Sequence, residues 1–276
     1  MLATIAVLLA IDEVLRIKTA VSILIFLLGV AGWCEAAVMG GVASRERGGG
    51  PWLFLSGLLG TAYFLALGWR EGASGPTGVL PLASGIAALV FLLFIVVVFR
   101  SDYVAAFPCL LLTLLGVLLF GFLFSYLLRI YHFEDGALVA AIFLLGIKGN
   151  DIAAYYVGRS LGRTRVLKVS PKKTLEGCAA GIAFSALWFA AAGAIWPHRF
   201  FPWPQALALG IILAVTAQIG DLSESLIKRF YQVKDSANVF PEFGGVLDLI
   251  DSALFSGFLF WVLLSSHAAG DQPLAG

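Results

Sequence analysis

Four aspartates stand beside or inside long apolar runs, where an ionised carboxylate is costly unless it meets a cation, a cavity or a polar partner. They are Asp151, Asp221, Asp248 and Asp251. Asp248 and Asp251 are three residues apart, so a helix would point both carboxylates to one side. Carboxylates that converge beside Lys and Arg side chains suit a divalent cation that also receives phosphate oxygens. We therefore expect a cation and phosphate site.

Two further patterns lie close to these acids. Asp221, Ser225 and Lys228 are spaced for one face of a helix. The Gly244–Gly245 pair directly precedes an apolar run that begins near Val246. Backbone without a Cβ atom lets a ligand come close, and the N–H groups of a helix start attract anions. A turn would require glycine as well, so this pair alone is a weak indication of a phosphate site.

A plainer explanation exists for each of these residues taken singly. Acids near the ends of membrane spans often only mark where water begins, and clusters of Lys and Arg often only set the topology. The combination is harder to explain in this way, because hydration does not require aspartate on three separate spans. The pattern as a whole favours a functional site.

The composition determines which elements can position such a site. Of the 276 residues, 60% are hydrophobic and 13% charged, whereas a soluble domain carries about 25% charged residues. The chain has too few charged residues to cover the surface of a soluble globule, so an integral membrane protein of the helical type is expected. The net charge of +1 indicates no partner, and no nucleic-acid partner is expected. Three cysteines lie far apart in apolar runs, which excludes a zinc motif and a disulfide framework.

A helix that crosses a bilayer needs about 20 mostly apolar residues. Eight runs qualify or nearly so, at about 20–42, 52–68, 79–99, 104–130, 137–158, 177–196, 206–220 and 248–265. Residues 1–11 form a weaker ninth run, expected to be a short or tilted span or an interfacial helix rather than a signal peptide. We predict an all-α polytopic membrane protein with about eight or nine transmembrane helices, in one membrane domain over residues 1–276, with the motifs in the half at about 137–265.

The basic residues predict the orientation in the membrane, because cytoplasmic loops are rich in Lys and Arg. If segment 159–176 is cytoplasmic, alternation puts segments 43–51, 100–103 and 221–247 on the same side. Together they hold twelve of the 18 Lys and Arg residues, against four on the opposite side. The two large polar segments, 159–176 and 221–247, are therefore expected to face the cytoplasm, with the protein in a bacterial inner membrane.

At this point the residues resemble a known family. The stretch Ser225-x-x-Lys228-Arg229-x4-Lys234-Asp235, followed by Pro241, Gly244–Gly245, Asp248 and Asp251, resembles the signature of the phosphatidate cytidylyltransferases (CDP-diacylglycerol synthases). Three other stretches are similar to that family: GNDIAAYYVGRSLGRT (149–164), SPKKTLEG (170–177) and GDLSES (220–225). The motifs cover residues 149–252, and the N-terminal half resembles the family only as a set of membrane spans.

The resemblance implies a reaction in which CTP and phosphatidate, a membrane lipid, give CDP-diacylglycerol and pyrophosphate with Mg²⁺ as cofactor. It implies that Asp221 and Asp248, and with them Asp251, hold the metal ion. The phosphate-binding set that it implies is Lys172, Lys173, Lys228, Arg229 and Lys234. Asn150, Asp151, Ser225 and Asp235 would line the site, with Gly244 and Gly245 beside the ligand, and Thr174 and Glu176 would order the preceding loop. Glu176 could equally be a helix N-terminal acid.

The sequence departs from the family pattern at two positions. Phe243 stands where the family usually has His, and Leu249 stands where it usually has Arg. Neither is an expected metal ligand, so we expect the two departures to tune the activity and not to abolish it. Glu35, alone among apolar residues, is expected to pair with Arg or Lys of another helix.

Two alternatives remain open. A CTP-dependent lipid kinase of the polyprenol or phytol type, or a cytidylyltransferase for an ether lipid, would share the nucleotide site and differ in the lipid cavity. An ion-coupled transporter would place its acids near the middle of several spans, whereas here they lie toward span ends. The sequence also leaves open whether two copies form a homodimer.

Overall fold

The computed structural model describes residues 18–42, 44, 49–74, 79–100, 102–165, 170–197, 200–233 and 245–270. Over this part of the chain, eight helices are long and apolar enough to cross a membrane, and each coincides with one predicted run. The prediction of a polytopic all-α membrane protein is thereby confirmed. The ninth candidate, residues 1–11, lies outside the described residues.

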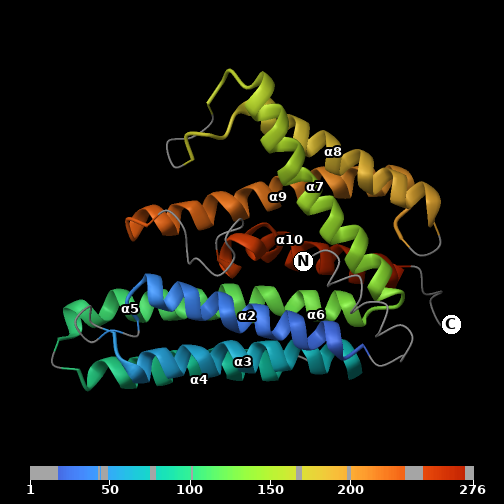
Figure 1. The fold of residues 1–276 in the computed structure, drawn as a ribbon. Coiled ribbons are helices and arrows are strands. Elements are labelled where there is room, and N and C mark those ends of the chain that lie inside the picture. The colour runs from blue at the N-terminus through green and yellow to red at the C-terminus, as the bar shows by residue number, and fades with distance from the viewer. Residues whose placement is uncertain are drawn as a thin grey trace. The chain divides into compact units, whose positions relative to one another are not determined.

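The helices are labelled in Figure 1 and have the following bounds: α2 Ala20–Met39, α3 Pro51–Ser74, α4 Val79–Val98, α5 Tyr103–Gly116, η1 Val117–Leu123, α6 Phe124–His132, α7 Gly136–Leu161, α8 Leu175–Ile195, α9 Trp203–Phe230 and α10 Val246–Gly270. Helices α5 and α6 are joined by the π-helical turn η1 into one span, Tyr103–His132. Helix α9 runs ten residues beyond the end of its predicted apolar run at residue 220. Its last turns carry the charged residues that hydropathy alone had assigned to a loop.

The chain packs as two compact units, each made of two segments. The first comprises Met1–Phe133 and Tyr231–Ile250, and the second comprises Glu134–Phe230 and Asp251–Gly276. The single membrane domain expected from the sequence stays a prediction.

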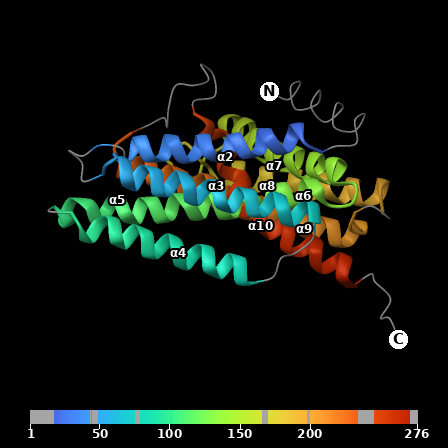
Figure 2. The ribbon, with the colours of Figure 1, turned by 90° about the horizontal axis from the view of Figure 1, so that it is seen from below.

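Within the first unit, helix α3 is the central element. It packs against α2, α4, α5, η1 and α6, and Figure 2 shows α2 and α3 side by side. The core of this unit contains the fully buried side chains of Trp33, Phe64 and Phe120. Helix α4 contacts only part of this core and exposes Phe91 and Phe94, as expected for a helix surface that faces lipid.

Within the second unit, α8 packs against α7 and α9, and α7 also contacts α9. Small residues allow the α7–α8 contact, because Gly177, Gly181 and Ser185 recur every four residues along α8. A Cβ atom on Gly177 would lie 2.5 Å from the carbonyl oxygen of Ala154 on α7. Alanine at position 177 would therefore separate the two helices.

Aromatic side chains attach α10 to the rest of the second unit. Phe260 stacks on Phe143 of α7 with a centroid separation of 5.0 Å, and it meets Phe189 of α8 edge-on at 6.3 Å.

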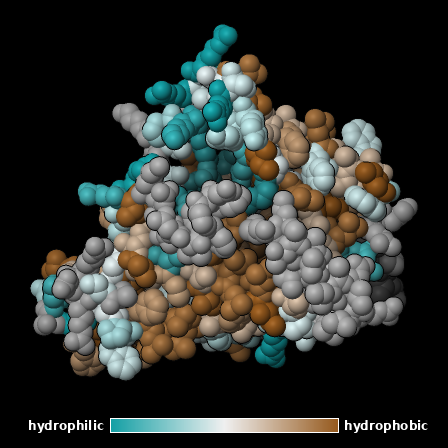
Figure 3. All heavy atoms as spheres, viewed as in Figure 1, coloured by the Kyte–Doolittle hydropathy of each residue, from teal (hydrophilic) through white to brown (hydrophobic). Residues whose placement is uncertain are grey.

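The hydrophilic side chains of this unit lie away from this aromatic cluster. On the face shown in Figure 3, hydrophilic side chains gather where Figure 1 shows the connection between α7 and α8.

Candidate functional site

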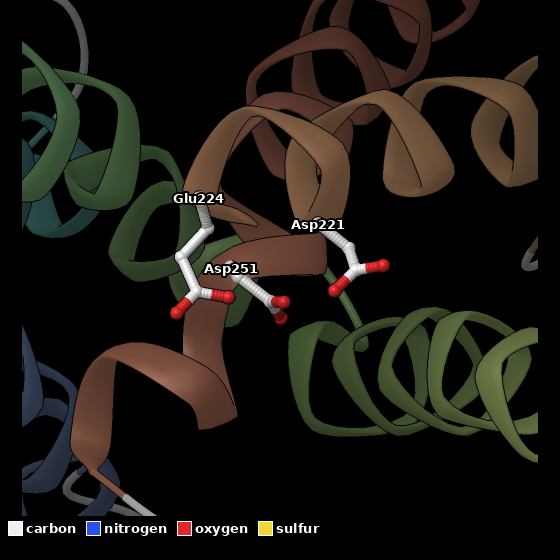
Figure 4. Close-up of side chains that lie close together, drawn as sticks. All are labelled: Asp221, Glu224 and Asp251. Carbon is white, nitrogen blue, oxygen red and sulfur yellow. The ribbon is translucent and has the colours of Figure 1, made fainter. Parts of the chain in front are cut away.

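Three carboxylates converge in the second unit. Asp221 and Glu224 lie one turn apart on α9, and Asp251 lies on α10. Each offers an oxygen atom within 4.8 Å of the others, and Figure 4 shows the three side chains turned toward one another. Glu224 and Asp251 are buried, whereas Asp221 is half-buried. Hard oxygen donors in this arrangement have the chemistry that Mg²⁺ or Ca²⁺ requires.

The close approach of α9 and α10 depends on Gly220. A Cβ atom at this position would lie 2.6 Å from the carbonyl oxygen of Asp251. Real Cβ atoms essentially never come so close to another heavy atom, so only glycine permits this spacing. Gly220 therefore determines how close the carboxylate of Asp221 comes to the carboxylate of Asp251.

Three lysines contact the carboxylates. The Lys173 ammonium group forms an ion pair with Asp221. Lys228 Nζ lies 2.8 Å from Glu224 Oε1, one helical turn along α9. Lys148 Nζ of α7 lies 3.7 Å from Asp251 Oδ1. Charges that would be costly inside an apolar protein are thereby compensated.

Lys173 lies outside the spans, in the turn before α8. Burial lowers the pKa of its ammonium group from the ordinary lysine value, and the neighbouring carboxylates of Asp151, Asp251 and Glu224 oppose this shift. The carboxylates thus favour the charged form of a lysine that would otherwise lose its proton more easily. A cation held in this way is suited to bind phosphate oxygens.

Helix α7 contributes a polar network to the same region. Asn150 is fully buried, and its Nδ2 donates a hydrogen bond of 3.0 Å to Asp151 Oδ1. Gln218 of α9 donates from Nε2 to Asn150 Oδ1 and to the Cys178 carbonyl oxygen, both at 3.0 Å. Asp151 Oδ2 lies 3.6 Å from Lys148 Nζ. The network ties α7, α8 and α9 together beside the carboxylates.

The loop before α8 is ordered by two side chains of the helix start. Thr174 Oγ1 accepts a hydrogen bond from Gly177 N–H at 3.2 Å and so caps α8. Glu176 accepts hydrogen bonds from Arg163 N–H and Thr164 N–H, each at 3.1 Å. These contacts connect the two ends of the α7–α8 connection and fix the backbone next to Lys173.

The start of α10 lies in the first unit and is capped by carboxylates of the protein. Asp248 Oδ2 accepts from Gly245 N–H at 2.9 Å. Glu35 of α2 accepts from Val246 N–H at 2.8 Å and from Leu247 N–H at 2.9 Å. The structure thus gives Glu35 these backbone partners, and its expected pairing with Arg or Lys stays a prediction. A phosphate bound at this helix start would have to displace one of these carboxylates.

The structure brings together six of the residues predicted from the sequence: Asn150, Asp151, Lys173, Asp221, Lys228 and Asp251. Thr174 caps α8, Lys172 is exposed in the turn before it, and Ser225 and Arg229 follow on α9. The metal-binding role of Asp248 stays a prediction, as do the roles of the others. Lys234, Asp235, Gly244 and the departure at Phe243 lie outside the described residues.

Two charged residues of this site had not been singled out from the sequence. Glu224 follows Asp221 at a spacing of three, the same spacing that drew attention to Asp248 and Asp251, so the pattern could have found it. Lys148 lies within an apolar span, and an ionisable residue in such a place is itself an indication of function.

Comparison with known protein families identifies a match over most of the chain. A model described as "Cytidylyltransferase family" matches residues 1–267. The chain belongs to this family. The resemblance found in the motifs of residues 149–252 is thereby confirmed, and the match extends it to the N-terminal half.

Curated relatives carry a more specific name. The chain is 38% identical over 152 residues to phosphatidate cytidylyltransferase of Bacillus subtilis (strain 168), covering 54% of this chain and 56% of the relative. It is 34% identical over 167 residues to the protein of that name from Aquifex aeolicus (strain VF5), covering 60% and 57%. For that of Synechocystis sp. (strain ATCC 27184 / PCC 6803 / Kazusa) the identity is 39% over 143 residues, covering 48% and 46%. The chain thus spans about half the length of the curated relatives it matches.

Proposed function

We propose that this protein is a phosphatidate cytidylyltransferase, which converts CTP and phosphatidate to CDP-diacylglycerol and pyrophosphate. A phosphate oxygen of the lipid attacks the α-phosphorus of CTP and forms a new phosphoanhydride bond. The bond between the α-phosphorus and the bridging oxygen to the β-phosphorus breaks, and the electron pair leaves with pyrophosphate. The nucleophile belongs to the substrate, so the protein has to supply positioning and charge compensation.

The observation that carries this proposal is the convergence of Asp221, Glu224 and Asp251 beside lysine side chains, in a helical membrane protein of the cytidylyltransferase family. Transfer of a nucleotidyl group to a lipid phosphate needs a cation site and phosphate-binding groups within reach of the membrane. In this proposal the carboxylates form the cation site, and the lysines provide the phosphate-binding groups.

The donor set fits Mg²⁺, which is held by one or two carboxylates and takes its other ligands from water and phosphate oxygens. In this proposal Asp221 and Asp251 hold the ion and Glu224 supports them, with Asp248 as a further candidate on α10. A bound Mg²⁺ would neutralise charge on the triphosphate and on the pyrophosphate that leaves.

The basic residues have separate roles in this proposal. Lys173 is placed to exchange its contact with Asp221 for a phosphate oxygen. Lys172, next to Lys173 in the sequence, and Arg229, on α9, are both exposed. They would contact the outer phosphates of CTP. Lys228 orients Glu224 through its contact of 2.8 Å.

The proposal also puts the site at the cytoplasmic face of a bacterial inner membrane. Supporting this, twelve of the 18 basic residues fall on the side that carries segments 159–176 and 221–247. CTP is water-soluble and phosphatidate resides in the membrane, so a site that lies between the membrane-spanning helices and opens to the cytoplasm could receive both.

A double-label assay tests the proposed reaction. The purified protein is incubated in detergent with phosphatidate, a polyprenol, Mg²⁺ and CTP labelled with ³²P at either the α or the γ position. A cytidylyltransferase transfers the α label to the lipid and releases the γ label as pyrophosphate. Transfer of the γ label to a lipid alcohol, with release of CDP, would instead identify a lipid kinase and overturn the proposal.

The sequence leaves open whether two copies form a homodimer, and the same preparation can test this. Native mass spectrometry of the protein released from detergent measures the number of chains in each particle. A mass of two chains would identify a homodimer, and a mass of one chain would exclude it under these conditions.

A further inference from the structure

Lys148 is a charged residue in the middle of a membrane-spanning helix. It lies on α7, Gly136–Leu161, and 29% of its side chain is exposed. Charged side chains inside membrane spans are costly and usually serve the function of the protein. The proposed reaction, as described above, gives this lysine no role.

The ammonium group of Lys148 makes one hydrogen bond and two ion pairs, all to groups of the protein. Its Nζ donates to Ser252 Oγ at 2.8 Å and lies 3.6 Å from Asp151 Oδ2 and 3.7 Å from Asp251 Oδ1. An ammonium group has three N–H donors and no acceptor, and three oxygen atoms surround this one. Lys148 is therefore suited to hold protein groups in place rather than to bind a substrate phosphate.

The charges around Lys148 show why a positive group is needed there. The region contains the carboxylates of Asp151, Asp221, Glu224 and Asp251, and the ammonium groups of Lys148, Lys173 and Lys228. Helix α10, which carries Asp251, has no Lys or Arg of its own. The positive charge beside Asp251 and Asp151 is thus supplied by α7.

We propose that Lys148 is a positioning residue that acts as a built-in cation of the carboxylate cluster. It joins Asp151 on α7 to Asp251 on α10 and keeps the Asp251 carboxylate directed toward Asp221 and Glu224. It also limits the negative charge of the cluster, so that the site holds its divalent ion without excess affinity. The effect on turnover rests on the proposed function, whereas the effect on cation binding does not.

The test separates cation binding from catalysis. Lys148→Met removes the charge and keeps the length of the side chain, Lys148→Arg keeps the charge, and Lys18→Met is the matched control. Lys18 lies in the first unit, where its ammonium group donates to the carbonyl oxygens of His132 and Phe133. Mn²⁺ affinity is measured by electron paramagnetic resonance in detergent, and turnover by transfer of the α label of CTP to lipid.

We expect Lys148→Met to bind Mn²⁺ about three- to tenfold more tightly, because a neighbouring positive charge has been removed. Its turnover should fall at least about tenfold, because the Asp251 carboxylate still binds the ion but is no longer held in the orientation that the reaction needs. Lys148→Arg should bind Mn²⁺ like the wild type and keep more turnover than Lys148→Met. Lys18→Met should leave both quantities unchanged.

Weaker or unchanged Mn²⁺ binding by Lys148→Met would overturn the inference, because a residue that only supports the fold would lower affinity and turnover together. Should Lys148→Met fail to give a single peak in size-exclusion chromatography, Lys148→Gln takes its place in both measurements. Tighter Mn²⁺ binding by the charge-removing variant, with no lipid product from the wild type, would support the role of Lys148 and refute the proposed function.

Discussion

At the scale of single residues, the site consists of acids whose charges are compensated by particular lysines. Asp221 is half-buried and pairs with Lys173, whereas Glu224 is buried and pairs with Lys228. Removing one partner of a buried ion pair leaves an uncompensated charge, which costs more than the pair contributes. Amide substitutions remove the charge of an acid and keep its size, so their effect comes from the charge and not from a cavity.

The amide variants Asp221→Asn and Glu224→Gln should each lower kcat more than about tenfold, which corresponds to about 1.4 kcal/mol of transition-state stabilisation. Each replaces a carboxylate oxygen of the cluster with a neutral group. The control Glu134→Gln changes an exposed acid of the second unit and should leave kcat unchanged. The measurement is the rate of CDP-diacylglycerol formation at saturating Mg²⁺. A variant that keeps more than a tenth of the wild-type rate would contradict a role for that acid in holding the metal ion.

At the scale of elements, two contacts position the helix that carries the last aspartates. Glu35 of α2 binds the first N–H groups of α10 in the first unit. Gly220 of α9 lets α9 approach the backbone of Asp251 in the second unit. Neither contact needs to touch a substrate, yet each determines where a functional carboxylate lies.

Glu35→Ala should lower the free energy of unfolding by about 1.5–3 kcal/mol, the range for hydrogen bonds to charged groups. It removes two acceptors from N–H groups that the helix itself cannot satisfy. Glu35→Gln keeps an acceptor oxygen and should cost less than Glu35→Ala. Unfolding in mixed micelles, followed by circular dichroism, measures both. Equal stability of Glu35→Ala and the wild type would show that the cap contributes nothing.

Gly220→Ala should reduce turnover strongly, because its Cβ atom would lie 2.6 Å from the Asp251 carbonyl oxygen and would push α10 away from α9. Gly60→Ala is the matched control, since its nearest neighbours are side-chain methyl groups of Leu89 and Val117 at 3.0–3.2 Å. Flexible side chains can give way, whereas a helix backbone cannot. Turnover and Mn²⁺ affinity are measured for both variants. Comparable loss in the two would show that the α9–α10 contact has no special importance.

At the scale of the whole molecule, the proposed orientation puts the connection between α7 and α8 in the cytoplasm. Cysteine is introduced at Ser160, at the end of α7, or at Ser74, at the end of α3, in a variant that lacks Cys34, Cys109 and Cys178. Both serines are exposed. A reagent that does not cross membranes should label Ser74→Cys on intact cells and leave Ser160→Cys unlabelled until the cells are opened. Labelling of Ser160→Cys from outside would reverse the topology.

The sequence by itself determined the eight spans and the family, because both are recorded along the chain. The length of an apolar run sets whether a helix can cross a bilayer, and the motifs of residues 149–252 keep their order and spacing whatever the packing. Hydropathy predicted the end of one run at residue 220, although helix α9 continues to Phe230. A hydropathy scale gives a charged residue the same value whether it is paired inside the protein or exposed to water.

Only the tertiary structure decided which of these residues meet. The spacing of Asp248 and Asp251 fixed their common helix face, but it could not show that Asp251 converges with Asp221 and Glu224. It could not show that Lys148 would join them, or that Glu35 would bind backbone N–H groups. Contacts of this kind join segments up to 212 residues apart, and they follow from close helix packing of the type that Gly220 allows. Periodicity along the chain describes one helix at a time, so it contains no information about the neighbour against which each face packs.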